Sequence, residues 1–249
     1  DHRDLHSFPT RRSSDLPQTQ YFRSKNQLGV FDKELKPTLL TYQEDALGGD
    51  LTRGYCEGSA NQWRWAVPFD TEGLISLFKS KEHFAQELNA FFEGNTAKLG
   101  AWYPGGCYWQ GNEPDLHAAY LFDDAGRPDL TQKWARWALD TRYANNYIGL
   151  DGNDDGSTLS AWYVFTALGF YPQASSDRYW LGSPLFPKAT LDLGGGKTLT
   201  IIANNAAPEN IYVKSVRING KTLDRWWFTH DEIAQGGFIH RGCVETACG

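Results

Sequence analysis

Three short segments hold side chains that could carry out acid–base or metal-assisted chemistry. The first, residues 55–65 (YCEGSANQWRW), places Glu57 between a cysteine and a glycine, close in sequence to Trp63 and Trp65. Aromatic surroundings disfavour a charged carboxylate and raise its pKa toward a value suited to donating a proton. Glu57 is therefore a candidate general acid. A purely structural glutamate, paired with a neighbouring arginine, fits these residues equally well.

The second segment, residues 108–117 (YWQGNEPDLH), gathers oxygen-bearing side chains. Carboxylate and amide oxygens are the hard ligands that calcium prefers. The candidate ligands are Gln110, Asn112, Glu113 and Asp115. The structural alternative is helix capping, because acidic side chains favour a first turn and proline fits the first helical position. From these residues alone, capping is the simpler explanation.

The third segment, residues 149–158 (GLDGNDDGST), places two adjacent carboxylates in a glycine-flanked turn. Such a pair is costly unless a cation, water or the N-terminus of a helix stabilises it. Asp154 and Asp155 are therefore candidates for metal binding or for a general base. A cluster of loop and cap residues with Asx turns is the alternative.

The composition narrows the class of protein. A formal net charge of -6 lacks the basic surface that nucleic acid binding needs, so we expect no nucleic acid partner. No apolar run is long enough for a bilayer span, so we expect no membrane span. Aromatic residues make up 14% of the chain, which suits either stacking on sugars or helix-to-helix packing. The four cysteines are too widely spaced for a zinc ribbon or a redox pair and leave the compartment open.

Helical patterns dominate the sequence from about Asp70 to Pro172. One helix is predicted to begin at Ser80 and end at Gly94, with an apolar stripe at Phe84, Leu88, Phe91 and Phe92. Another is predicted from Asp129, aligning Leu130, Trp134, Trp137 and Ala138. A third, from about Thr158 to Gly169, is apolar almost all round, so we expect it to be deeply buried.

The pattern changes to a period of two after Pro172, in the runs ATLDL, KTLTIIA and IYVKSVRI. Asn219-Gly220 predicts a two-residue type I′ hairpin. We therefore expect a β-rich module over residues 173–249 after a helical part over residues 21–172. Residues 1–20 show no structural period and resemble a translated sequencing adaptor, so we expect a non-native leader there and a native sequence that begins near Tyr21.

An ordered set of motifs resembles glycoside hydrolase family 92. The set contains YFRSKN, then YCEG with QWRW and VPFD, then GNEPDLHAAYLF, GNDDGSTLSAWYVFTALGFYP and WFTHDEI. It extends over roughly residues 21–237, and five motifs in one order are far more specific than any single pattern. Two motifs depart from the family, because its EGNAWQY is EGSANQW here and its VPHD is VPFD. These departures concern the details of the sugar subsites and of linkage preference.

The resemblance implies a calcium-dependent, inverting exo-α-mannosidase that hydrolyses terminal α-mannosidic bonds of glycans, with α-1,2 bonds favoured. It implies a mainly α fold, in which part of an (α/α)6 toroid catalytic domain precedes the β-rich C-terminal module. The chain would then be a C-terminal fragment of a secreted or periplasmic enzyme, and its oligomeric state stays open. Two other functions remain possible: a non-catalytic carbohydrate-binding module, or a toroid-fold glycosidase of other specificity.

The resemblance also implies roles for individual residues. Glu57 matches the general acid of the family, and Asp155 matches the base, with Asp154 as the neighbouring alternative. In an inverting enzyme, their carboxyl groups would stand roughly 6.5–9.5 Å apart. The remaining positions are implied to bind substrate or calcium: Gln62, Trp63, Trp109 and His117 for the substrate, and Gln110, Asn112 and Glu113 for Ca²⁺.

Overall fold

The computed structural model describes residues 21–23, 30, 31, 37, 38, 55, 58–95, 98–100 and 106–247. The chain divides into two compact units. The first unit comprises the described residues up to Ala118 together with Tyr147–Gly152. The second unit comprises Ala119–Asn146 and the described residues from Asn153 onward. A functional boundary at residue 172 stays a prediction.

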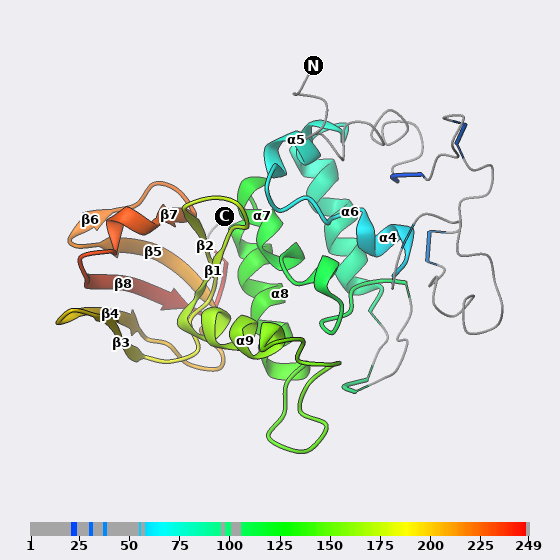
Figure 1. The fold of residues 1–249 in the computed structure, drawn as a ribbon. Helices are drawn as coiled ribbons and strands as arrows, with labels where there is room; N and C mark the ends of the chain where they lie inside the picture. The colour runs from blue at the N-terminus through cyan, green and yellow to red at the C-terminus, as the bar shows by residue number, and fades with distance from the viewer. Residues whose placement is uncertain are drawn as a thin grey trace. The chain divides into compact units, whose positions relative to one another are not determined.

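The helices of the first unit are α4 (Ala60–Trp63), α5 (Thr71–Ser76) and α6 (Lys81–Glu93), followed by the short 3₁₀ helix η3 (Glu113–Asp115) (Figure 1). The predicted limits of α6 are confirmed. The Ser80 hydroxyl accepts a hydrogen bond from the backbone N–H of His83 at 3.0 Å, and the helix ends at Gly94. The predicted apolar stripe of α6 is buried. A cap and a periodic stripe together define this helix.

An aromatic cluster joins α6 to the segment after α4. Trp65 is fully buried, stacks on Phe78 with ring centroids 5.8 Å apart, and meets Phe84 of α6 edge-on at 5.5 Å. The Arg64 guanidinium lies over the rings of Trp65 and Phe78, at 4.7 Å and 4.8 Å from their centroids. Arg64 also forms an ion pair with Glu87 of α6 at 3.0 Å. The consecutive residues Arg64 and Trp65 therefore fix the chain that leaves α4.

The helices of the second unit are α7 (Leu121–Asp124), α8 (Pro128–Thr141) and α9 (Thr158–Leu168), and the 3₁₀ helix η4 (Ala118–Tyr120) spans the boundary between the units in the sequence. Helix α8 begins at Pro128, one residue before the predicted start. Arg127 donates two hydrogen bonds to the Asp129 carboxylate, at 2.9 Å and 2.7 Å. Trp134 and Ala138 are buried, as the predicted stripe requires.

The prediction that α9 is deeply buried is wrong for part of its surface. The side chains of Leu159, Trp162, Thr166 and Ala167 are buried, whereas Val164 is 56% exposed. Within the described residues, α9 packs through one face only. Helix α9 is apolar on nearly all faces, but the described residues bury only one of them, so its composition overestimated its burial.

Two sheets complete the second unit. The three-stranded sheet has the order β1-β2-β7 and is antiparallel, with strands β1 (Phe170–Pro172), β2 (Arg178–Leu181) and β7 (Trp227–Thr229). The five-stranded sheet has the order β3-β4-β8-β5-β6. Its strands are β3 (Lys188–Gly194), β4 (Lys197–Asn204), β5 (Tyr212–Ile218), β6 (Lys221–Thr222) and β8 (Gly237–Val244). The β4–β8 pair is parallel, and the other pairs are antiparallel. The 3₁₀ helix η5 (His230–Glu232) follows β7.

The sequence correctly predicted a β-rich part after the helices and the turn between β5 and β6. Asn219 and Gly220 have φ values of 48° and 82°, as the positive φ angles of a type I′ turn require. No helix among the described residues is long and apolar enough to cross a membrane.

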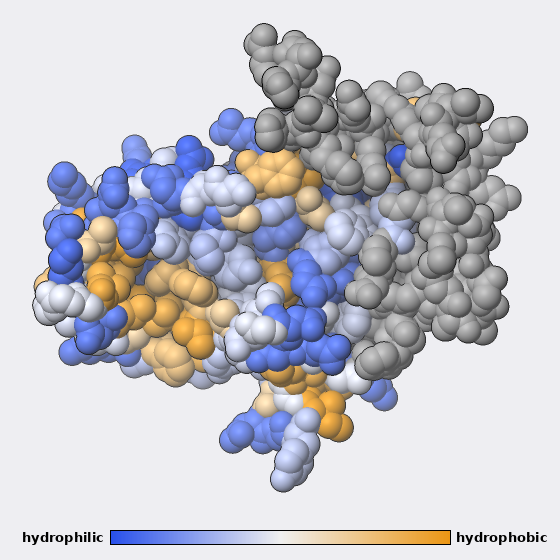
Figure 2. All heavy atoms as spheres, in the orientation of Figure 1, coloured by the Kyte–Doolittle hydropathy of each residue, from blue (hydrophilic) through white to orange (hydrophobic). Residues whose placement is uncertain are grey.

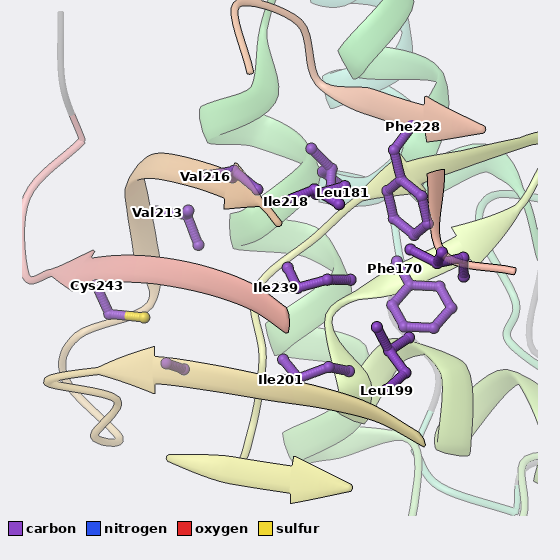
Figure 3. Close-up of a cluster of buried hydrophobic side chains, with 12 residues drawn as sticks. Phe170, Leu181, Leu199, Ile201, Val213, Val216, Ile218, Phe228, Ile239 and Cys243 are labelled. Carbon is purple, nitrogen blue, oxygen red and sulfur yellow. The ribbon is translucent and has the colours of Figure 1, made fainter. Parts of the chain in front are cut away.

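The hydrophobic core of the second unit lies on one face of the five-stranded sheet (Figure 3). Leu199 and Ile201 of β4 and Ile239 of β8 point into a cluster that also contains Phe170 of β1 and Phe228 of β7. The rings of Phe170 and Phe228 meet edge-on, with centroids 5.4 Å apart. The two sheets therefore share one core.

A buried arginine ties β8 to the end of α9. Arg241 is 1% exposed and donates hydrogen bonds to the carbonyl oxygens of Gly169 at 2.5 Å and Gly182 at 2.8 Å. Burial lowers the pKa of Arg241 to about 10. Gly169 ends α9 with φ at +88°, and a Cβ there would lie 2.6 Å from Arg241 Nη1. Only glycine suits this position, on grounds of both backbone conformation and space.

We predict that Arg241→Met lowers the free energy of unfolding of the second unit by about 2–4 kcal/mol, because the guanidinium hydrogen bonds to the carbonyls of Gly169 and Gly182 are both lost and the Gly169 carbonyl keeps only the N–H of Gly182. Chemical denaturation of the full-length protein measures this change, and hydrogen exchange of the backbone amides of β8 measures it locally. Lys197→Met, at an exposed position of β4, is the control and should change the midpoint little. Equal effects of the two variants would contradict the role of Arg241.

Candidate active site

In the first predicted segment, the structure describes Tyr55 and the residues from Gly58 onward. Glu57 lies outside the described residues, and so does Cys56. Gly58, which follows Glu57, is buried. A Cβ on Gly58 would lie 2.9 Å from the Trp63 indole nitrogen and 3.1 Å from the Asn112 amide nitrogen. The backbone just after Glu57 therefore packs closely against a predicted substrate residue and a predicted calcium residue.

A capping box fixes the first turn of α4 after Gly58. The Ser59 hydroxyl accepts the Gln62 N–H at 3.1 Å, and the Gln62 side-chain oxygen accepts the Ser59 N–H at 2.9 Å. The same two side chains also reach the second segment. Ser59 Oγ donates to the Gly106 carbonyl at 2.8 Å, and Gln62 Nε2 donates to the Cys107 carbonyl at 3.1 Å. Gln62 is fully buried, so its amide joins the two segments and presents no exposed atom to a ligand.

The second segment forms η3, with Pro114 at a first-turn position. Helix capping explains only part of its composition, because the Asn112 side chain makes no cap hydrogen bond. Asp115 is fully buried, and its carboxyl accepts the Trp109 backbone N–H at 2.9 Å. Burial raises the pKa of Asp115 well above its ordinary value, and the hydrogen bond from Trp109 opposes this shift. Asp115 therefore supports the loop from inside.

Residues Tyr147–Gly152 belong to the same unit and contact this segment. The Trp109 indole N–H donates to the Asp151 carbonyl at 2.8 Å, and the Gly100 N–H donates to Asp151 Oδ1 at 3.1 Å. Asp151 is 1% exposed. The sequence did not single out Asp151, and its only signal was a position in the same acidic turn as Asp154. Trp109 is half-buried, so part of its indole remains available to a ligand.

His117 is buried and holds the backbone of the aromatic cluster. Its Nε2 lies 2.7 Å from the Trp65 carbonyl oxygen, and because that oxygen can only accept, Nε2 carries the proton. Burial lowers the pKa of His117 to about 4, so the ring is neutral near pH 7. His117, predicted as a substrate residue, therefore positions the chain that follows α4.

Because the folded pKa of His117 lies below its ordinary value of 6.5, the unfolded chain binds the proton first as the pH falls. Its stabilising contribution is complete above pH 6.5 and is lost progressively toward pH 4. We predict that the stability difference between wild type and His117→Gln shrinks by up to about 3 kcal/mol across this window. Thermal or urea unfolding of the full-length protein at pH 7, 5.5 and 4 measures it. A difference that stays constant with pH would contradict the prediction.

The third segment places its two aspartates in different environments within the second unit. Asp154 Oδ1 accepts the Ser160 N–H, and Oδ2 accepts the Ser160 hydroxyl, each at 2.8 Å. The Asp154 carbonyl also accepts the Thr158 N–H at 2.7 Å. Both oxygens of Asp154 are thus used to hold the start of α9.

Asp155 is exposed, and within the described part of the chain its carboxylate has no hydrogen-bond partner. It begins three successive residues with positive φ, at 45° for Asp155, 66° for Gly156 and 73° for Ser157. Non-glycine residues rarely adopt this conformation, and it costs energy unless the surroundings fix it. The Thr158 hydroxyl helps by donating to the Asp155 carbonyl at 2.6 Å. The backbone of this turn is therefore fixed, while the Asp155 carboxylate makes no hydrogen bond with a described residue.

The side chains predicted to bind calcium provide some of the oxygen ligands that this cation prefers. Glu113 offers an exposed carboxylate. Asn112 is buried, and its amide nitrogen has no partner among the described residues, so the amide can turn its oxygen toward a cation. The Gln110 amide oxygen accepts a hydrogen bond from the Tyr108 hydroxyl. Within the described ranges, no three histidine, cysteine, aspartate or glutamate side chains cluster as metal ligands, so amide oxygens and water would complete the set.

Comparison with protein families matches the model of the glycosyl hydrolase family 92 catalytic domain to residues 12–241. A relative described as an uncharacterized secreted glycosidase, from Arthroderma benhamiae, is 26% identical over 237 residues. That match covers 89% of this chain and 29% of the relative.

Solved structures from Bacteroides thetaiotaomicron are also similar. A family GH92 α-mannosidase in complex with mannoimidazole has a TM-score of 0.81 and 32% identity, covering 93% of this chain and 31% of its own. A family GH92 inverting mannosidase has a TM-score of 0.80 and 31% identity, covering 96% and 33%. The chain thus spans about a third of the length of these relatives.

Proposed function

The chain belongs to glycosyl hydrolase family 92, and from this premise we propose that it is part of an exo-acting α-mannosidase that hydrolyses terminal α-mannosidic bonds of glycans. The similar solved structures are described as α-mannosidases at 31–32% identity, which supports this substrate class. The observation that carries the proposal is the network in which Ser59 and Gln62 bind the carbonyls of Gly106 and Cys107. It joins the segment that follows Glu57 to the loop of predicted calcium residues.

We assign the general acid to Glu57 and the general base to Asp155. In an inverting mechanism the acid protonates the leaving oxygen, while the base takes a proton from a water that attacks the opposite face of the ring. The Asp155 carboxylate is exposed and makes no hydrogen bond with the described residues, which supports its role as the base. The two hydrogen bonds from Ser160 to Asp154 favour a positioning role for Asp154, which holds the turn that displays Asp155.

Asn112 and Glu113 would hold calcium, with Gln110 next to them in sequence, and the ion would bind and orient sugar hydroxyls and favour the distorted ring geometry that hydrolysis needs. Trp63 and Trp109 are both half-buried and would offer indole faces to the sugar. Gln62 and His117 would not contact the sugar and would fix the backbone at Cys107 and Trp65. These roles separate residues that contact the substrate from residues that support them.

The wider setting is also proposed by analogy with the family. The helices would form part of an (α/α)6 toroid over residues 21–172, with residues 173–249 as the β-rich module. Secretion or export to the periplasm is supported by the description of the Arthroderma benhamiae relative as secreted. Preference for α-1,2 bonds is carried over as a proposal.

We predict that Glu57→Gln and Asp155→Asn each lower kcat of the full-length enzyme on an α-mannoside by about 10²–10⁴-fold, because each removes a proton-transfer group. Asp154→Asn should lower kcat less and keep the pH profile of the wild type, since an amide oxygen can still accept from Ser160. Asp177→Asn, at an exposed loop position, is the matched control. Steady-state kinetics measured over a range of pH values give these effects. A larger loss in Asp154→Asn than in Asp155→Asn would reverse the assignment.

Proton NMR of freshly released mannose tests the stereochemistry. Inversion is expected, and retention would exclude the assigned roles of acid and base. A non-catalytic binding module would instead be supported by two results together: the wild-type protein does not hydrolyse the glycan, and the Glu57→Gln variant still binds it.

We also predict that chelation of calcium abolishes mannosidase activity and that Glu113→Gln weakens the activating affinity for calcium about tenfold or more, because one carboxylate ligand is lost. Activity after dialysis against chelator, titrated with CaCl₂, measures this affinity. Glu209→Gln is the control at an exposed site in the second unit. Full activity in chelator would favour a metal-free glycosidase of other specificity.

A further inference from the structure

The outer face of the five-stranded sheet carries a groove of about 420 Å³ over β4, β5 and β8. Buried residues of β8 alternate with residues on this face, so Ile239 and Cys243 enter the core while Phe238, His240 and Gly242 line the groove. Figure 2 shows apolar residues over the region of β4 and β8, with hydrophilic residues toward the end of the sheet. The volume lies in the range of small-molecule sites, about 300–1,000 Å³.

Basic side chains meet in this groove, and none of the described residues that line it is acidic. Arg217 of β5 stands directly opposite His240 of β8 in the antiparallel register. Side chains at such positions lie on the same face, with Cβ atoms about 4.5–5.5 Å apart. The next pairs in the same row are His240 with Ile202 and Ile202 with Lys188, so a second cation follows toward β3.

The guanidinium of Arg217 makes no hydrogen bond or ion pair with any described residue, and no carboxylate lines the groove. This arrangement contrasts with the net charge of -6 on the chain. The Arg217 guanidinium and an imidazole N–H of His240 can both donate hydrogen bonds, so an anion held between these two side chains would accept from both.

Neutral hydrogen-bonding groups surround the same point. The register shifts between Val213 and Ser215, and such bulges redirect side chains. Ser215 pairs with Gly242, and a Cβ on Gly242 would lie 3.2 Å from Ser215 Oγ, so the hydroxyl occupies the space above the glycine. Asn204 of β4 pairs with Gly242 from the other side. A hydroxyl and an amide thus flank the basic pair.

An exposed ring closes one side of the groove. Phe238 is 50% exposed and stacks on His240, with ring centroids 5.9 Å apart and planes at 29°. Its backbone N–H donates to Asn219 Oδ1 at 2.9 Å, which holds the start of β8. A fixed aromatic face is suited to the apolar face of a sugar ring.

We propose that this groove binds a tetrahedral oxyanion, phosphate or sulfate, either as the free ion or as an ester on a saccharide. The anion lies between Arg217 and His240, and Ser215 and Asn204 donate to its remaining oxygens. Arginine suits this ligand because its fork of donors binds oxyanions in a bidentate manner. In the ester form, the sugar ring rests on Phe238. None of these residues takes part in the proposed hydrolysis, so the groove is a second, separate site.

The test is calorimetric titration of the full-length protein with sodium phosphate, sodium sulfate and glucose 6-phosphate at constant ionic strength. We expect saturable binding at one site, and Arg217→Gln should weaken it about tenfold or more. Lys197→Gln removes the same charge from β4 outside the groove and should leave the affinity unchanged. Phe238→Ala distinguishes the two forms of the ligand. It weakens binding of glucose 6-phosphate alone if the ester is recognised, and weakens neither if the free ion is the ligand.

Three outcomes would overturn the proposal: no saturable binding of any probe, equal losses in Arg217→Gln and Lys197→Gln, or failure of phenylglyoxal to modify Arg217 in the ligand-free protein. The last result would mean that another part of the polypeptide already fills the groove. Because binding is read directly, a negative result says nothing about mannosidase activity, and an inactive enzyme that binds the anion leaves this proposal intact.

Discussion

Two side chains that cap one helical turn also fasten together the two segments from which the first unit is organised. Ser59 and Gln62 satisfy each other's backbone N–H groups and then bind the carbonyls of Gly106 and Cys107. All these groups are buried or partly buried, so losing any one of them would leave a polar atom without water or a partner. Gly58, Trp63 and Asn112 come within contact distance because this junction holds.

The second unit uses the same principle at a different place. Arg241 comes from β8, yet its hydrogen bonds are with the carbonyls that follow α9 and β2. One buried cation thus joins a helix end to both sheets. The turn ahead of α9 is held from the other end by Asp154, so the helix is fixed at both termini by side chains rather than by burial alone. This explains how α9 keeps its place while Val164 remains exposed.

Capping residues, apolar periodicity and turn dipeptides correctly predicted the helices and turns that depend on neighbouring residues in the sequence. Ser80, the stripe of α6 and Gly94 define that helix completely, and Asn219-Gly220 defines its hairpin. The parallel pairing of β4 with β8 was out of reach, because a period of two records which face is apolar and says nothing of which strand lies alongside.

The site followed the same division between local and long-range information. The sequence identified the three chemistry-bearing segments, but equivalent residue types within them proved different in the fold. Asp154 and Asp155 are neighbours in the chain, yet both oxygens of the Asp154 carboxylate accept hydrogen bonds, whereas the Asp155 carboxylate makes none with the described residues. Likewise Gln62 and His117 are polar residues in a predicted sugar site that the fold uses for internal hydrogen bonds. Such differences depend on partners distant in sequence, such as Cys107 for Gln62 and Trp65 for His117.

The position of β8 in the middle of the five-stranded sheet has a consequence for how this protein is made. Among the described strands, β4 and β5 do not pair with each other, and both pair with β8, which follows them in the sequence. During synthesis, the β3–β4 hairpin and the β5–β6 hairpin must therefore wait as separate pieces with exposed edges until β8 leaves the ribosome. The shared core forms in that late step, and it depends on contacts between residues far apart in the chain, which makes it slow.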